Sequence, residues 1–181
     1  MIVSPPLLRA AAWVVLLCGC ASPAPRPTDY GAPISGRLSV RVEAQPVRVV
    51  SAGFELSGDA RAGVLALTSP LGSTLARAHW SDHEAVLTTP AGQSRFASLD
   101  DLAVQALGER LPMAALFDWM RGRPWSGAAS AALSDGESGF EQLGWRVSLA
   151  RFGDGWLDAR RDAAPAVTVR ARLDTHPTAS P

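Results

Sequence analysis

Lysine is missing from this sequence, because all 17 basic residues are arginine. A chain without lysine forms neither a Schiff base nor a Ser-Lys dyad, and it lacks the phosphate clamp of a P-loop ATPase. Positive charge is not in excess either, since 17 acidic residues balance the arginines, so no basic surface for nucleic acid is predicted. Without a nucleotide site, any directional work by this protein must run downhill in free energy.

Cysteine is almost as scarce, and its two occurrences lie at positions 18 and 20. Residues 1–19 carry a single cation, Arg9, before an apolar run at 10–17. That run is shorter than the roughly 20 residues needed to span a bilayer, which favours a signal peptide over a membrane helix. The end of this segment, Leu-Cys-Gly-Cys, is similar to a bacterial lipobox, in which Cys20 is acylated and becomes the mature N-terminus. An ordinary cleaved signal with an incidental thiol is the alternative.

Cleavage before Cys20 would leave one cysteine, which excludes an intramolecular disulfide. Several acyl chains on Cys20 would anchor the protein firmly, because each buried CH₂ contributes about 0.8 kcal/mol. Residue 21 is alanine, not the aspartate that retains enterobacterial lipoproteins at the inner membrane, so we expect the protein on the periplasmic face of the outer membrane. Residues 20–33 include four prolines and are typical of an extended tether, followed by a globular domain at 34–181.

Alternation of apolar and polar residues dominates from Ile34 onward, which predicts antiparallel strands with one wet face. In the first strand, Leu38, Val40 and Val42 share the apolar face. Further strands are predicted at 47–56, 63–69, 74–80, 84–89, 93–97, 142–152, 156–160 and 167–173. Strands this short and this close together indicate a meander.

Two short helices are predicted in the middle of the chain. Ser98 begins a capping-box pattern, and the apolar residues after it recur at helical spacing as far as Ala106. Pro112 suits the first position of a second helix, which Gly122 would end. Helices of about nine residues are marginal alone, so both must lie against the apolar face of the sheet, where such a plug can leave an apolar hollow. Residues 123–139 are predicted to form a mobile loop.

Few residues of the sequence are candidates for metal binding or catalysis. His79 and His83 could begin a metal site, but no third ligand is visible and the residues between them are typical of a hairpin turn. Asp100 and Asp101 could form a catalytic pair, but helix capping accounts for both. The sequence has no nucleophile elbow. We therefore predict no catalytic residue, no metal and no cofactor.

Five tryptophans follow the signal segment, at positions 80, 119, 125, 145 and 156. Core packing accounts for most of them, because an indole buries a large area. The other interpretation is that a ring lines an acyl-binding hollow. Trp119 follows the apolar stripe of the second helix and Trp125 follows Gly-Arg-Pro, so these two are the candidates for the mouth or lid of the hollow.

The sequence LTSPLGST at 67–74 places a large aliphatic residue at a turn. Pro70 and Gly72 force the turn between two strands, and Leu71 stands between them although turn tips are usually polar. Leu71 either folds back onto the core or projects into solvent. A projecting leucine beside a lipid anchor would enter the membrane interface or contact an incoming acyl chain.

The turn at 67–74 and the segment GERLPMAALFDWMRGRP at 108–124 resemble the LolB family of outer-membrane lipoprotein receptors. The resemblance runs from about residue 34 to residue 173 and includes the Gly-Trp pair at 144–145. It implies a mainly β (α+β) fold, an unclosed antiparallel β-barrel with short helices forming a lid over an apolar cavity. Phe54-Glu55 stands where the family has an aromatic residue followed by glutamine.

The resemblance also implies a function. Such a receptor accepts acylated lipoproteins from the soluble periplasmic carrier LolA and inserts them into the outer membrane without nucleotide hydrolysis, and we expect it to be a monomer. The family's insertion leucine corresponds to Leu71, in the loop with Pro70 and Gly72. The candidates for the acyl cavity or its lid are Leu116, Phe117, Trp119, Met120, Trp125 and Trp145. The alternatives are a lipid-anchored structural envelope lipoprotein that binds protein partners and no acyl chain, and an outer-membrane enzyme.

Overall fold

A computed structural model describes residues 32–174, and nearly half of them belong to one antiparallel sheet. The order across the sheet is β6-β5-β4-β3-β2-β1-β11-β10-β9-β8-β7, so two meanders join where β1 pairs with β11. The strands are β1 (Ile34–Val42), β2 (Arg48–Gly58), β3 (Gly63–Thr68), β4 (Thr74–Trp80), β5 (Ala85–Thr89), β6 (Gly92–Phe96), β7 (Ser130–Ala132), β8 (Gly139–Gln142), β9 (Trp145–Ser148), β10 (Trp156–Arg161) and β11 (Val167–Leu173).

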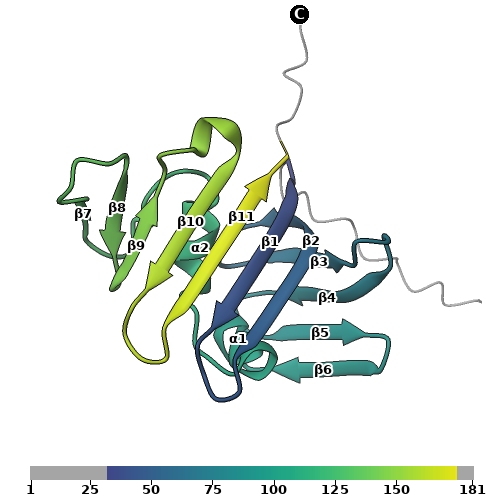
Figure 1. The fold of residues 1–181 in the computed structure, drawn as a ribbon. Coiled ribbons are helices and arrows are strands. Elements are labelled where there is room, and N and C mark those ends of the chain that lie inside the picture. Colours follow the sequence, from purple (N-terminus) through teal and green to yellow (C-terminus); the bar gives the residue numbers. More distant parts are fainter. Residues whose placement is uncertain (1–31, 175–181) are drawn as a thin grey trace, which may run out of the picture.

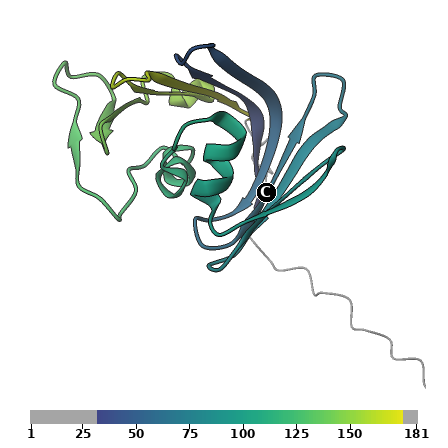
Figure 2. The same ribbon diagram turned by 90° about the horizontal axis from the view of Figure 1, so that it is seen from below.

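The barrel is open, because β6 and β7 are the two edges of the sheet and do not pair with each other. The helices α1 (Leu99–Leu107) and α2 (Met113–Trp119) connect these edges in the sequence, and the sheet curves around them (Figures 1 and 2). The prediction of an unclosed antiparallel barrel with two short helices is confirmed. A single 3₁₀ turn, η1 (Phe152–Asp154), precedes β10.

The start of α1 follows the predicted capping pattern. The Ser98 hydroxyl accepts a hydrogen bond of 3.1 Å from the Asp101 backbone amide, which satisfies one of the amides that a helix leaves unpaired at its N-terminus. Gly108 ends the helix in the left-handed conformation at φ +74°. The second helix differs slightly from its prediction, since Pro112 is its N-cap and not its first helical residue.

We expect Ser98→Ala to lower the free energy of unfolding by about 1 kcal/mol, because the substitution removes the side-chain cap and adds no clash. Urea unfolding of the wild-type protein and the variant would measure this difference. Ser94→Ala, which removes an exposed hydroxyl from β6, is the control and should change stability by less than about 0.5 kcal/mol. Equal stability of all three proteins would contradict a capping role.

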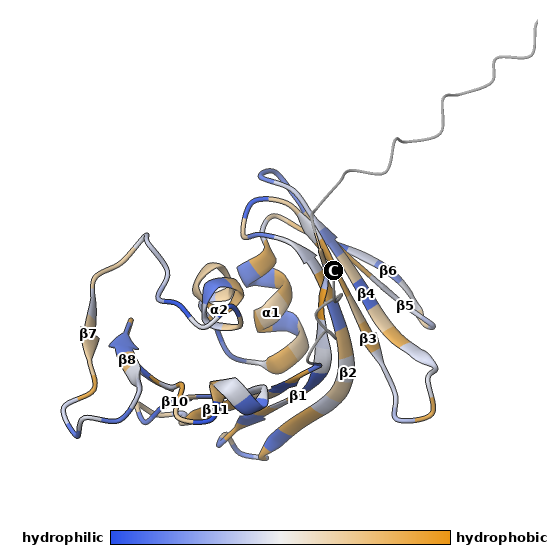
Figure 3. Cartoon of the chain, turned by 90° about the horizontal axis from the view of Figure 1, so that it is seen from above, coloured by the Kyte–Doolittle hydropathy of each residue, from blue (hydrophilic) through white to orange (hydrophobic). Residues whose placement is uncertain are grey.

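The concave face of the sheet carries two separate clusters of buried residues. Apolar and polar residues alternate along the strands (Figure 3), and the buried apolar ones pack with residues of the helices. One cluster contains Trp119 and Trp145 with residues of β1 and β8–β11. The other contains Trp80 and Phe117 with residues of β2, β4 and α1, and the Trp80 and Phe117 rings stack with centroids 5.3 Å apart. The helices therefore bridge the two halves of the sheet.

Two predicted elements were wrong. The strand expected at 142–152 is divided, because Leu143 and Gly144 both have positive φ, of 53° and 74°, and form a turn between β8 and β9. The segment expected to be a mobile loop at 123–139 contains β7, which pairs with β8. Side-chain hydrogen bonds described below also fix the beginning of this segment.

Within residues 32–174, no helix is long and apolar enough to cross a membrane. The predicted signal peptide, Cys20 and most of the predicted tether lie outside the described residues.

Candidate functional site

An apolar cavity of about 170 Å³ lies between the concave face of the sheet and the two helices. It is situated where the two buried clusters meet, so it draws residues from both. All of its lining residues are apolar: Leu38, Val40, Val50, Phe54, Leu56, Leu65, Leu67, Ala78, Val169 and Ala171 from the sheet, and Leu99, Leu102, Ala103, Ala106, Leu107, Leu111, Met113, Leu116, Phe117 and Met120 from the helices and the segment between them. A cavity with such a lining offers water no hydrogen-bond partner and favours hydrocarbon.

The predicted cavity residues fall into three groups. Leu116, Phe117 and Met120 line the cavity from α2 and its C-terminal end. Trp119 and Trp145 lie instead in the neighbouring core, where they are almost completely buried and their ring centroids are 5.8 Å apart. The reason is helical geometry, since Trp119 lies on the side of α2 that faces β8 and β9. Trp125 lines a different hollow, next to the β2–β3 turn.

Most of the cavity wall was absent from the predicted site residues. Phe54 is 4% exposed and lies on the concave face, whereas its neighbour Glu55 points outward and is exposed. The alternation in β2 carried this information, because every second residue from Val50 to Leu56 is apolar. What the alternation could not show is which of these residues border empty space.

The two helices are held with unequal firmness. Leu102 and Ala103 are the buried residues of α1, whereas α2 buries four residues, among them Phe117 and Trp119. The segment between the helices is also pinned, since Glu109 forms a half-buried ion pair of 3.1 Å with Arg161 on β10. Because α1 has fewer buried residues to oppose its displacement, we expect it to be the wall of the cavity that moves most easily.

Gln142 is the one buried polar residue within 32–174, at 2% exposure, and sequence reasoning missed it. Its side-chain oxygen accepts hydrogen bonds from the Trp119 indole, at 2.8 Å, and from the Trp125 backbone amide, at 2.9 Å. Its side-chain nitrogen donates to the backbone carbonyls of Trp125, at 2.7 Å, and Ala128, at 2.8 Å. All four hydrogen-bonding positions of the amide are therefore used, and the segment after α2 is fixed to β8.

A second hollow, of about 720 Å³, lies between the β2–β3 and β4–β5 turns and the C-terminal end of α2, and Phe117 lines both this hollow and the apolar cavity. We call this hollow the vestibule. The Arg121 guanidinium crosses it, donating to the carbonyl of Phe117 at 2.8 Å and to that of Gly58 at 2.9 Å. This contact ties the end of α2 to the β2–β3 turn.

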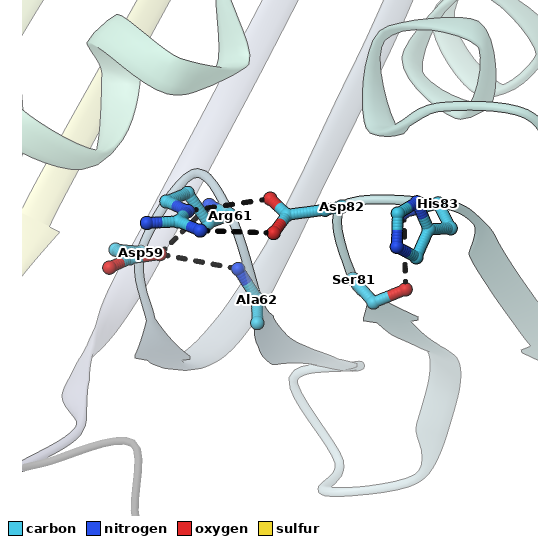
Figure 4. Close-up of polar contacts among 6 residues, drawn as sticks. All are labelled: Asp59, Arg61, Ala62, Ser81, Asp82 and His83. Atoms are coloured by element: carbon cyan, nitrogen blue, oxygen red, sulfur yellow. Dashed lines mark hydrogen bonds and ion pairs between the residues drawn. The ribbon is translucent and has the colours of Figure 1, made fainter.

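The rim of the vestibule is formed by two neighbouring turns (Figure 4). In the β2–β3 turn, the Asp59 carboxylate accepts hydrogen bonds from the backbone amides of Arg61 and Ala62. Arg61 then reaches across to Asp82 in the β4–β5 turn, with 3.2 Å between the charged groups, and this hydrogen bond raises the pKa of the Arg61 guanidinium above its ordinary value. Both partners are exposed, so the pair orders the rim and adds little stability.

Leu71 projects from the β3–β4 loop and is 94% exposed, which decides between the two orientations that the sequence left open. The loop holds itself by backbone hydrogen bonds, from the Ser69 amide to the Ser73 carbonyl and from the Gly72 amide to the Ser69 carbonyl. Gly72 has φ +83°, a conformation that glycine adopts without strain. A rigid turn therefore presents a leucine that contributes almost nothing to the core.

The residues weighed for other chemistry lie apart from the cavity. His79 is on β4 and His83 is in the β4–β5 turn, where its amide contacts Ser81 (Figure 4). Residues 32–174 contain no group of three metal-ligating side chains. Asp100 and Asp101 lie in the first turn of α1, where carboxylates are favoured by the exposed backbone amides.

The open antiparallel half-barrel, its helical plug and its apolar cavity define one structural class. Residues 33–170 match the family described as outer membrane lipoprotein LolB. The chain is 37% identical to the outer-membrane lipoprotein LolB of Bordetella petrii over 155 residues, which is 80% of this chain and 78% of that protein. It is 35% identical to that of Ralstonia nicotianae over 88% of this chain and 81% of the relative, and 32% identical to that of Halorhodospira halophila over 86% and 82%. The chain therefore belongs to the LolB family and is an outer-membrane lipoprotein.

Proposed function

We propose that this protein accepts acylated lipoproteins from a periplasmic carrier of the LolA type and inserts them into the outer membrane. The observation that carries the proposal is the apolar cavity between the sheet and the helices, which can shelter hydrocarbon. Cys20 would carry the lipid anchor, residues 20–33 would form the tether, and Leu71 with Pro70 and Gly72 would enter the membrane.

Acyl chains need such a shelter because water excludes them. Each exposed CH₂ costs about 0.8 kcal/mol, so a chain of roughly 16 carbons costs on the order of 10 kcal/mol in water. Without nucleotide hydrolysis, the cargo moves forward only if this protein binds the acyl chains more tightly than the carrier does and the bilayer holds them more tightly still.

The cavity must widen to take a full acyl chain. Its 170 Å³ is below the roughly 300–1,000 Å³ of pockets that enclose small molecules. The weakly held α1 is the element that can move, while Gln142 and the Glu109–Arg161 pair hold α2 and the segment before it. Loading therefore displaces α1 from β5 and β6.

A structural envelope lipoprotein that binds no acyl chain is the rival function. The two are separated by reconstitution of the full-length, lipid-anchored protein in vesicles, with a triacylated lipoprotein supplied on its carrier. Our proposal requires the cargo to move into the vesicles in the absence of ATP. Cargo that stays on the carrier at every concentration of the protein would favour the structural role.

The cavity itself is tested by Ala103→Phe. Ala103 is 3% exposed on α1 and lines the cavity, so a phenyl ring there occupies the space that an acyl chain needs. We expect acyl uptake from the carrier to fall at least tenfold, measured as cargo crosslinked to the protein. Val104→Phe adds the same ring to the exposed side of the same helix, where Val104 is 37% exposed, and should load normally. Equal loading by both variants would place the acyl site elsewhere.

A further inference from the structure

One row of outward-facing residues crosses five neighbouring strands and leads to the Leu71 loop. In the sheet register Thr68 of β3 is opposite Gly53 of β2, Gly53 is opposite Arg37 of β1, Arg37 is opposite Arg172 of β11, and Arg172 is opposite Trp156 of β10. With strands about 4.8 Å apart, this row is roughly 20 Å long. Its first member lies three residues before Leu71.

The arginines of this row differ from most others in the protein. Eight arginines within residues 32–174 form ion pairs with carboxylates. Over the same range, no carboxylate lies within ion-pair distance of Arg37, Arg172 or the nearby Arg151. Arg37 and Arg172 are directly opposite each other, an arrangement of like charges that destabilises a sheet. The fold thus keeps two adjacent positive charges without neutralising them.

Trp156 joins these cations into one surface. The Arg151 guanidinium lies 4.8 Å from the centre of its ring and that of Arg172 lies 5.6 Å from it. Trp156 is half-buried on the wet side of β10. An indole in contact with two arginines combines an apolar ring with positive charge, which suits the level of the lipid head groups.

Two carboxylates stand beside the cations. Asp154 and Asp174 line the same hollow as Arg37 and Arg172, a space of about 280 Å³. Asp174 accepts a hydrogen bond of 3.0 Å from the Ser35 hydroxyl, and among the described residues neither carboxylate pairs with an arginine. Both signs of charge therefore line one hollow without contacting each other.

A second hollow continues this surface to the Leu71 loop. It measures about 400 Å³, and its lining includes Arg37, Thr68, Pro70 and Gly72 together with Asp174. Gly53, the second residue of the row, also lines this hollow and has no side chain to fill it. Arg37 and Asp174 border both hollows, so the charged surface is continuous with the base of the loop.

The described part of the chain also begins beside this charged surface. Strand β1 begins at Ile34, and Ser35 contacts Asp174 beside the end of β11 (Figure 1). The 14 residues from Cys20 to Pro33 span at most roughly 50 Å. A lipid on Cys20 would therefore keep the start of β1, and the charged surface beside it, near the bilayer.

We propose that this surface binds the head groups of aminophospholipids while Leu71 enters the bilayer, an inference that rests on the insertion role proposed above. Arg37 and Arg172 would bind the lipid phosphate. Asp154 and Asp174 would accept hydrogen bonds from the primary ammonium, which a choline head group cannot donate. Trp156 would lie at the level of the head groups. The surface thereby sets the orientation in which the Leu71 loop meets the membrane.

The test follows the depth of the loop without cargo or carrier. Full-length, lipid-anchored protein carrying Ser73→Cys, an exposed position in the same loop that leaves Leu71 in place, is labelled with an environment-sensitive fluorophore and reconstituted in vesicles of phosphatidylcholine alone, with added phosphatidylethanolamine, or with added phosphatidylglycerol. We expect the inserted fraction, read from quenching by bilayer spin probes, to be largest with phosphatidylethanolamine. Arg37→Gln with Arg172→Gln should lower it roughly tenfold or more, because each substitution removes a charge-assisted hydrogen bond to the lipid phosphate, which contributes about a tenfold factor.

Two further variants complete the design. Arg48→Gln with Arg110→Gln removes two exposed arginines that make no ion pair in the described part of the chain. Arg48 is the first residue of β2 and Arg110 lies between α1 and α2, so both are outside the row, and this control should leave insertion unchanged. Asp154→Asn with Asp174→Asn should remove the preference for phosphatidylethanolamine over phosphatidylcholine and increase insertion with phosphatidylglycerol.

Equal insertion of the protein with unaltered arginines into all three lipids would overturn the proposal. So would a loss of insertion in the Arg48 and Arg110 control as large as the loss in the Arg37 and Arg172 variant. It would also be overturned if the Arg37 and Arg172 substitutions left insertion intact and reduced only cargo uptake from the carrier, because the surface would then bind a protein. None of these results bears on the acyl cavity, so a failure here is distinct from a failure of the proposed transfer function.

Discussion

Replacing Leu71 with glutamate is expected to leave cargo loading intact and to abolish cargo insertion. Leu71 is 94% exposed, and the loop is closed by backbone hydrogen bonds that the substitution does not touch. The free energy of unfolding should therefore not change. In the bilayer the two side chains differ, since an acidic side chain costs about 3 kcal/mol at depth while leucine is favourable. The population of the membrane-inserted loop should fall on the order of 100-fold.

The measurement is the appearance of cargo in vesicles that contain the lipid-anchored variant, with cargo crosslinking as a separate readout of loading. Val47→Glu is the matched control, because Val47 is also an exposed apolar residue, at 47%, but lies in the β1–β2 connection. That variant should insert cargo normally. A Leu71→Glu protein that inserted cargo at the wild-type rate would remove the loop from the mechanism, and one that failed to load would place Leu71 in the uptake step.

The sheet could be predicted because its strands have one wet face. In β1 the side chains of Val40 and Val42 are buried while Arg41 is exposed, so the pattern in the sequence equals the pattern of burial. The β3–β4 loop could also be predicted from the sequence, because Pro70 and Gly72 favour a turn independently of distant contacts. The direction of the Leu71 side chain could not be predicted, because the same turn is compatible with a side chain that packs on the core and with one that projects into solvent.

The β7–β9 region could not be predicted, because its structure depends on contacts distant in sequence. Type I′ turns normally use asparagine, aspartate or glycine at positions with positive φ, and Leu143 at φ 53° gives no such signal. The strand Ser130–Ala132 has no β-branched residue and exists because β8 pairs with it. Gln142 resembles a wet-face residue in the sequence, and only its partners near 119–128 explain its burial.

Tryptophan positions show the same limit at the site. Helical spacing places Trp119 beside Leu116 and Met120 along one stripe, yet Trp119 packs on β8 and β9 while the other two face the cavity. A stripe wide enough to contact two surfaces does not reveal which surface is solid and which is hollow. The cavity emerges only when both halves of the sheet are placed around the helices.

Gln142→Leu should be the most destabilising single substitution in the region of the site. It leaves the Trp119 indole, the Trp125 amide and two backbone carbonyls without their partner. An unsatisfied buried polar group costs about 1–3 kcal/mol, and partial hydration of the loop returns some of this, so we expect a loss of about 3–5 kcal/mol. Thermal unfolding should shift downward by roughly 10 °C. Gln93→Leu, the same change at an exposed position on β6, should shift it little.

Gln142→Glu separates lost hydrogen bonds from a general packing defect. An ionised carboxylate keeps the two acceptor contacts but faces the carbonyls of Trp125 and Ala128, so the folded protein should hold the proton and raise the pKa of Glu above its unfolded value of about 4.3. A folded-state pKa that is raised means that stability falls as pH rises above about 4.3 and levels off past the folded pKa. The difference between this variant and wild type should therefore grow from pH 4 upward, whereas that of Gln142→Leu stays constant. A pH-independent difference for both variants would show that the side-chain nitrogen of Gln142 does not hold the loop.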